Sequence, residues 1–217
     1  MILLLISIIS IIYLLYYAND KSIARALSNT WITLVTFIWV MTEILSAFRI
    51  WTSATVILCW VTLLFVLLYA IYKKRYSIIF KIFYRSKWIL VFFVYFVFVF
   101  IAGLLSGQYN MDSMVYHLPR IMHWMQNGSV GHFAAGIDFQ IRYPSLTEYL
   151  VAQVYLFGCS DRLANLVQTF AYLASSVMVF GISRKIGASE KASFTAAFVY
   201  LMIPMALAQA FSTQTDD

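Results

Sequence analysis

Charged residues are scarce in this chain of 217 residues, at 11% of the sequence, where a soluble domain carries roughly 25%. Hydrophobic residues make up 63%, and the mean hydropathy is +0.83. So few charged side chains cannot cover a water-facing surface of this size. The composition therefore excludes an ordinary soluble domain and predicts a protein that has the bilayer as its solvent and main partner.

Cysteine and proline are also rare, with two and three residues. Cys59 lies inside an apolar run and Cys159 near the outer end of another, so the sequence predicts no disulfide framework. The N-terminus, Met1-Ile-Leu-Leu-Leu, lacks both a basic region and a cleavage motif. It predicts a first membrane span and not a cleaved signal peptide.

Six apolar runs are long enough to cross a hydrocarbon core, which takes about 20 helical residues. No run alternates with a period of two, so they predict helices and not barrel strands. The predicted spans are 2–18, 31–50, 54–72, 88–105, 162–183 and 191–211. The shorter segment 146–157 contains Gln153, and we interpret it as an interfacial or re-entrant helix. If segment 146–157 crossed the membrane instead, the orientation of the last two spans would be reversed.

The basic residues predict the orientation. The connector 73–87 carries six lysines and arginines and no acid, which indicates the cytoplasmic side. With alternating spans, 11 basic and two acidic residues fall inside, four basic and six acidic residues fall outside, and every lysine is inside. Because the positive charge lies in short loops, the net charge of +6 predicts topology and no nucleic-acid partner.

This orientation divides the chain into three parts. Residues 1–105 hold four spans and the cytoplasmic loop 73–87, residues 106–160 form a long external segment, and residues 161–217 hold two further spans ending at an external acidic motif. The external segment is too long to be a mere connector. We expect an all-α membrane protein of about six transmembrane helices, multi-pass in the inner (plasma) membrane, with its active face extracytoplasmic.

An amphipathic helix is predicted over 113–127. If this helix lies in the membrane interface, Asp112, His117 and Arg120 are at headgroup depth. Asp112 is suited to cap the helix. Pro119 predicts a kink in it. The two faces are an apolar stripe of Met114, Leu118, Ile121, Met122 and Met125 and a polar face of His117, Arg120, Trp124 and Asn127.

Each of these polar residues also has a purely structural interpretation. Asp112 is explained by a cap alone, His117 and His123 by interfacial polar contacts, and Arg120 by pairing with a lipid phosphate. The two histidines are six residues apart, on different helix faces, which argues against a shared metal. The sequence leaves these alternatives open.

Three further acids are candidates. Asp216 and Asp217 follow the last predicted span, on the same predicted side as Asp112. Adjacent carboxylates suit a hard divalent cation, so Asp112, Asp216 and Asp217 form a candidate metal site, with a solvated span end as the alternative. Glu43 lies within the second apolar run, where an acid is a functional candidate by default.

Several motifs resemble bacterial integral-membrane glycosyltransferases of the GT-C superfamily. They are the run Met111–Arg120, Trp124, the pair Tyr143-Pro144, Asp161–Asn165 and the closing stretch Pro204–Asp216. The chain looks most similar to the family 39-like branch, which is related to protein mannosyltransferases and lipid A aminoarabinose transferase. The resemblance covers about 106–217, and residues 1–87 match only in being hydrophobic.

The resemblance implies transfer of a sugar from a polyprenyl-phosphate donor to a lipid, glycan or protein acceptor at the outer membrane face. Asp112 matches the essential acid of the first large external loop, which activates the acceptor or helps hold a metal. Asp216 and Asp217 match the acidic group of the next external loop. The implied cofactor is at most a divalent cation, Mg²⁺ or Mn²⁺.

The residue types suit this chemistry. A carboxylate near the anomeric carbon acts as a base or stabilises an oxocarbenium-like state. The leaving lipid phosphate needs positive charge, which Arg120 or Arg142 can supply through its N–H donors. His117 adds a hydrogen bond, and Tyr116 and Tyr143 complete the predicted substrate-binding set.

The sequence departs from the superfamily pattern in two respects: three spans precede the unit that normally opens the fold, and the first loop offers a lone Asp. Superfamily members continue through several more spans, so we expect this chain to be a fragment that is inactive alone. The alternative function is a transporter, flippase or polymerase of lipid-linked saccharides. A transporter predicts charges or helix breaks at the midplane, and only Glu43 and Pro204 offer these.

Overall fold

The computed structural model describes residues 2–18, 23–74, 87–108, 110–158 and 161–213. In this part of the chain all regular structure is helical. The elements are α1 (Ile2–Ala18), α2 (Ile23–Ala47), α3 (Ser53–Lys74), α4 (Lys87–Leu105), the π-helix η1 (Ser113–His117), α5 (Leu118–Asn127), α6 (Phe139–Arg142), α7 (Leu146–Leu156), the 3₁₀-helix η2 (Asp161–Leu163), α8 (Asn165–Lys185), α9 (Glu190–Leu201) and α10 (Pro204–Gln209).

Three helices are long and apolar enough to cross a membrane, which supports a multi-pass membrane protein. They are α2 over Ala24–Ala47, α3 over Ser53–Lys73 and α8 over Asn165–Lys185. Two shorter apolar helices, α1 and the Leu90–Leu105 part of α4, match the other predicted early spans. A helix suits a bilayer because it satisfies its own backbone hydrogen bonds.

The predicted boundaries need two corrections. Helix α2 begins at Ile23 and not at residue 31, and the predicted sixth span, 191–211, is not one continuous helix. It divides into α9 and α10 at Met202 and Ile203, where Ile203 is extended with φ −67° and ψ 115°. Pro204 explains the break, because proline lacks an N–H donor and disfavours the α conformation in the preceding residue.

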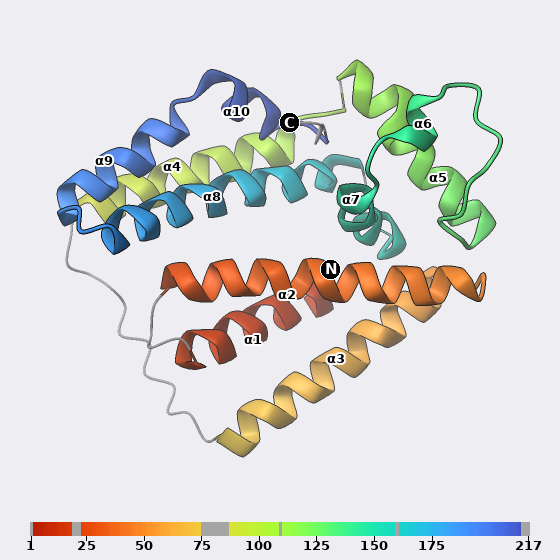
Figure 1. The fold of residues 1–217 in the computed structure, drawn as a ribbon, viewed down its shortest axis with the longest axis horizontal. Coiled ribbons are helices and arrows are strands. Elements are labelled where there is room, and N and C mark those ends of the chain that lie inside the picture. Colours follow the sequence, from red (N-terminus) through yellow and green to blue (C-terminus); the bar gives the residue numbers. More distant parts are fainter. Residues whose placement is uncertain (1, 19–22, 75–86, 109, 159–160, 214–217) are drawn as a thin grey trace.

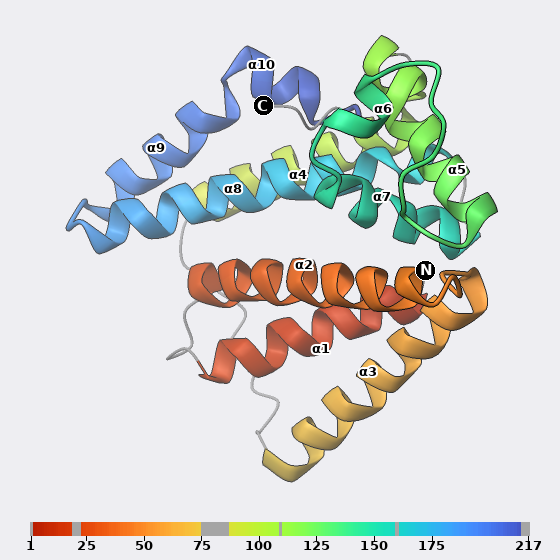
Figure 2. The same cartoon turned by 45° about the vertical axis from the view of Figure 1, so that its right-hand side comes forward.

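The helices form two groups, with the external segment at one end (Figures 1 and 2). One group contains α1, α2 and α3, and the other contains α4, α8, α9 and α10, with α2 packed against both α1 and α8. Helix α7 contacts α2, α5 and α8. Buried Trp60 of α3 donates a hydrogen bond of 3.0 Å to Gln153 of α7, which ties α7 to the first group.

Helix α7 is too short for a membrane span, and its interfacial or re-entrant position stays a prediction. It has 11 residues, about 16 Å at 1.5 Å per residue, which is too short to cross a core of about 30 Å. Six of its residues are buried, including Glu148, Tyr149 and Gln153. It is therefore a short helix packed inside the protein.

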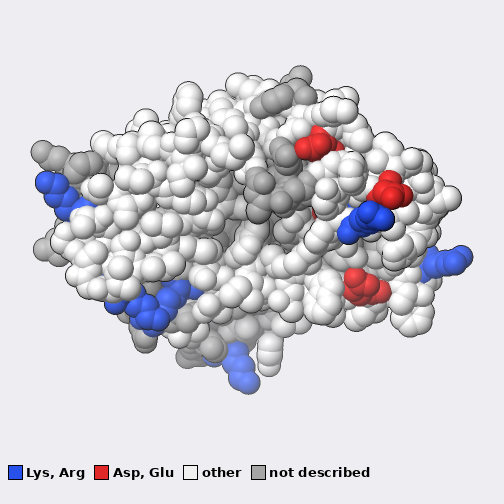
Figure 3. All heavy atoms as spheres, turned by 45° about the horizontal axis from the view of Figure 1, so that its top comes forward, with Lys and Arg blue, Asp and Glu red and all other residues white. Residues whose placement is uncertain are grey.

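Several basic residues gather at one end of the described helices. The start of α2, the end of α3, the end of α8 and the start of α9 lie toward one end of the molecule, and these positions carry Arg25, Lys73, Arg184, Lys185 and Lys191. On the face of the molecule that Figure 3 shows, the acidic side chains lie toward the opposite end, which carries α5, α6 and α7. Most of the basic connector 73–87 lies outside the described residues.

Glycine permits the close approach of α2 and α8. A Cβ atom added to Gly181 of α8 would lie 2.5 Å from the Cβ atom of Ala24 of α2. Because the start of α2 meets the end of α8, the two helices run antiparallel. Small residues at such crossings let helix backbones pack tightly in a membrane.

We predict that Gly181→Ala lowers the free energy of unfolding by about 1–3 kcal/mol, because the added methyl group overpacks the contact with Ala24. Thermal unfolding of the detergent-solubilised protein measures the loss. Gly136→Ala is the matched control, since a Cβ there meets nothing within 4 Å. The double variant Gly181→Ala/Ala24→Gly should regain stability. Equal unfolding temperatures for Gly181→Ala and Gly136→Ala would contradict the packing argument.

Candidate functional site

The helix after Asp112 contains a π turn. Residues 111–127 are continuously helical, and in η1 the Leu118 N–H donates to the Ser113 carbonyl, five residues back. Pro119 cannot donate to the Val115 carbonyl, and the Gln140 side-chain amide fills that role at 2.9 Å. The π turn lies directly before Pro119, at which the sequence predicts a kink, and such turns are frequent at functional sites.

Asp112 lies half-buried in the first turn of this helix. Its side chain makes no capping hydrogen bond, so the predicted N-cap role is wrong. The side-chain oxygen of Asn110 instead accepts from the Asp112 backbone N–H at 3.0 Å. Since Asn110 satisfies a first-turn N–H, a cap does not account for the carboxylate at position 112.

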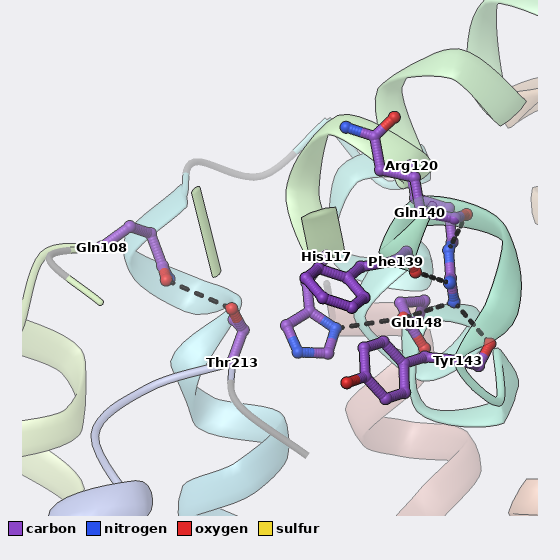
Figure 4. Close-up of polar contacts among 8 residues, drawn as sticks. All are labelled: Gln108, His117, Arg120, Phe139, Gln140, Tyr143, Glu148 and Thr213. Carbon is purple, nitrogen blue, oxygen red and sulfur yellow. Dashed lines mark hydrogen bonds and ion pairs between the residues drawn. The ribbon is translucent and has the colours of Figure 1, made fainter. Parts of the chain in front are cut away.

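A buried ion cluster connects this helix to α7 (Figure 4). Arg120 Nη1 lies 2.8 Å from Glu148 Oε1, and His117 Nδ1 lies 3.0 Å from the same oxygen. Arg120 is 0% exposed, and His117 and Glu148 are each 2% exposed. A charge this deeply buried needs a partner, and Glu148 supplies it from α7.

Three backbone carbonyl groups complete the surroundings of Arg120. Its Nε donates to the Gln140 carbonyl at 2.6 Å, Nη1 to the Tyr143 carbonyl at 3.1 Å and Nη2 to the Phe139 carbonyl at 2.8 Å. The acceptors belong to α6 and the residue that ends it, where helix carbonyls lack internal partners. One guanidinium thus connects the helix 111–127, the α6 segment and α7.

This arrangement corrects the predicted orientation of the amphipathic helix. His117 and Arg120 face the protein interior and not the headgroup layer, while Met111 and Met114 are 76% and 58% exposed. Arg120 is not positioned to pair with a lipid phosphate, because the guanidinium is buried and occupied. The physical reason is Glu148, whose carboxylate attracts the polar face inward.

Four of the five predicted substrate-binding residues gather around this cluster. The Tyr116 ring lies 4.2 Å from the His117 ring and 5.4 Å from the Tyr143 ring, measured between centroids, and Tyr116 is buried. Arg142 is the exception. Its side chain is 77% exposed and lies 3.7 Å from Asp138, so it is an accessible cation beside the cluster.

A second polar cluster joins the external segment to the end of the described chain (Figure 4). Gln108 Nε2 donates to Asn165 Oδ1 at 2.6 Å, and the Thr213 hydroxyl donates to Gln108 Oε1 at 3.4 Å. Gln108 precedes Asp112 by four residues, and Thr213 precedes Asp216 by three. At most four residues of sequence therefore separate each acid from this contact.

The predicted cation site lies partly outside the described residues, since Asp216 and Asp217 are not among them. Within the described part no three His, Cys, Asp or Glu side chains converge. The metal ligand set of Asp112, Asp216 and Asp217 stays a prediction.

Sequence reasoning missed the contact roles of Gln108, Gln140 and Glu148. Glu148 did carry a signal, because it is the one acid of α7, in the first turn of a mostly apolar segment. Such an acid needs a cation nearby once it is buried, and the arginines of α5 and α6, Arg120 and Arg142, are the candidates. The glutamines carry no comparable signal, since their amides pair with groups that the fold alone brings near.

We predict that Glu148→Gln lowers the free energy of unfolding by about 3–5 kcal/mol, because Arg120 would stay buried without a counter-charge. Thermal unfolding of the solubilised protein measures the loss. Asp138→Asn is the control, since its ion pair with Arg142 is more than three-quarters exposed and is worth about 0–1 kcal/mol. Similar losses in both variants would contradict a dominant role for the buried pair.

Comparisons with family models, with curated proteins and with solved structures found no match to this chain.

Proposed function

We propose that this chain belongs to a glycosyltransferase that moves a sugar from a polyprenyl-phosphate donor to an acceptor at the extracytoplasmic membrane face. The observation that carries the proposal is the contact between Gln108 and Thr213. It joins the segment that bears Asp112 to the segment that leads to Asp216. The motif resemblance of residues 106–217 supports the same reaction.

The position of this contact also supports the proposal. It lies where α4 ends and α8 begins, away from the basic ends of α2, α3, α8 and α9, and the positive-inside rule assigns basic ends to the cytoplasm. Acceptors and donors on the outer face would therefore reach Asp112 without crossing the bilayer. We propose the inner (plasma) membrane as the location.

In the proposed reaction Asp112 acts as the base. Its carboxylate takes the proton of the acceptor hydroxyl while the acceptor oxygen bonds to the anomeric carbon, and the bond from that carbon to the phosphate oxygen breaks. The polyprenyl phosphate leaves with the electron pair of that bond. The exposed guanidinium of Arg142 is the better candidate for the phosphate, because Arg120 is occupied by Glu148 and three carbonyls.

Arg120, His117 and Tyr116 then have positioning roles. Their contacts hold the helix that begins at Asp112 against α6 and α7. A base is effective only when its geometry is fixed within a fraction of an ångström, and packed second-layer contacts provide that rigidity. Tyr143, which is 38% exposed, lies at the edge of the cluster and is suited to touch a sugar ring.

A transporter of lipid-linked saccharides is the second candidate. The break between α9 and α10 favours it, because interrupted helices line substrate paths in many transporters. A transporter would move the intact lipid-linked sugar and form no new glycosidic bond. The transfer assay below therefore separates the two functions.

We predict that Asp112→Asn lowers transfer at least about 100-fold, because the amide cannot accept the acceptor proton. The assay follows labelled sugar from a polyprenyl-phosphate donor into product, in membranes that contain the full-length protein. Glu190→Gln, at the opposite end of the molecule, is the matched control and should keep full transfer. Undiminished transfer by Asp112→Asn would remove the base assignment.

We also predict that positions 112 and 216 face the same compartment. In a variant without Cys59 and Cys159, single cysteines at 112 and 216 should react with a membrane-impermeant maleimide added outside intact cells. A cysteine at Lys73 should react only after permeabilisation. Labelling of 112 and 216 from opposite sides would leave no shared site and would overturn the proposed function.

A further inference from the structure

A groove of about 360 Å³ lies between α2 and the start of α7, apart from the buried ion cluster. Helix α2 contributes Thr36, Trp39 and Glu43, and the facing segment contributes Pro144, Ser145 and Tyr149. All of its lining residues are described, and none of them is lysine or arginine. The groove therefore offers a carboxylate, hydroxyl groups and an aromatic ring, and no cation.

The contributing residues of α2 share one helix face. Thr36, Trp39 and Glu43 follow the spacing i, i+3 and i+7, which brings side chains to one side of a helix. Glu43 precedes the helix end at Ala47 by four residues, so it lies about 6 Å from that end. An acid this close to the end of a spanning helix can reach the hydrated edge of the bilayer, and Trp39 on the same face is half exposed.

Tyr149 fixes the carboxylate of Glu43. Its hydroxyl donates to Glu43 Oε1 at 2.9 Å. Burial raises the pKa of Tyr149 to about 12, the contact with Glu43 adds to this, and a hydrogen bond from Ser145 opposes it. The phenol stays protonated at neutral pH, holds Oε1 in place, and leaves Oε2 for a ligand.

We infer that this groove binds the primary ammonium head group of a zwitterionic membrane lipid. An ammonium group supplies N–H donors and a positive charge, which the Glu43 carboxylate accepts. The Trp39 ring adds a cation–π contact. The lipid phosphate would stay on the water side of the groove, because the lining holds no cation to receive it.

The inference is independent of the proposed glycosyl transfer. The groove lining includes neither Asp112 nor the residues that contact Thr213. Its closest link to the ion cluster is α7, where Tyr149 of the groove directly follows Glu148 of the cluster. Loss of transfer in the Asp112 variant and loss of lipid binding in a Glu43 variant are therefore separate results.

Native mass spectrometry of the full chain tests the inference. The solubilised protein is offered equal amounts of phosphatidylethanolamine, phosphatidylcholine and phosphatidylglycerol with identical acyl chains. We expect retention of phosphatidylethanolamine roughly tenfold above phosphatidylglycerol, with phosphatidylcholine between them, because its trimethylated nitrogen keeps the charge and lacks N–H donors. Equal retention of the three lipids, or strongest retention of phosphatidylglycerol, would overturn the inference.

Two variants assign the effect to the groove. Glu43→Gln keeps the size of the side chain and removes its charge, so it should lower retention of phosphatidylethanolamine to the level of phosphatidylglycerol. Trp39→Leu, at a half-exposed position, should lower retention of both nitrogen-bearing lipids. Asp138→Asn removes a carboxylate that is 78% exposed and outside the groove, and should keep the wild-type order. A preference unchanged by Glu43→Gln would overturn the assignment.

Discussion

The buried ion pair between Arg120 and Glu148 is the constraint on which the external segment depends. Both side chains are almost fully excluded from solvent, and neither charge is stable there without the other. The helix that begins before η1 must therefore face α7, and α7 must present its first turn to that helix. The carbonyl groups around α6 complete the arrangement, so three sequence segments fix one another.

Other polar contacts connect this part of the chain to both groups of helices. Glu148 belongs to α7, whose Gln153 bonds to Trp60 of α3, while Gln108 and Asn165 connect the start of the external segment to α8. Polar contacts are well suited to this task in a bilayer, because lipid tails solvate apolar helices as well as protein does. Association of the helices then depends on close packing and hydrogen bonds, as at Gly181 and Ala24.

The sequence predicts well those helices that are recognised by the length of a hydrophobic run. Hydrophobic runs locate α1, α3, α4 and α8 because a bilayer of fixed thickness demands fixed helix lengths. Hydropathy alone does not predict the break at Ile203, which is a local effect of Pro204 on the backbone. Nor does it predict that α2 begins at Ile23, because its first two turns include polar residues that still suit a helix.

The candidate site is predicted only in part, for a physical reason. The spacing of polar and apolar residues predicts two faces of a helix. In a membrane protein, however, the polar face can contact either water or buried polar partners, and the spacing does not distinguish them. The pattern of residues 113–127 therefore predicted the helix but not its buried face, which combines His117, Arg120 and Trp124 of the predicted polar face with Ile121 of the predicted apolar stripe. The partner that decides the matter, Glu148, is 28 residues from Arg120, and only the fold shows their proximity.

The π turn before Pro119 has a consequence for the tolerance of this segment to changes in length. A helical residue turns the chain by about 100° and advances it by about 1.5 Å. Since η1 accommodates one residue more than an α-helical path between the same points, deleting one residue there would convert the π turn into regular α-helix and keep the direction of Asp112 relative to the anchored Arg120. The same deletion in a regular stretch of α-helix would rotate one side by about 100°, so residues 113–117 should accept a one-residue deletion more readily than the helix that follows them.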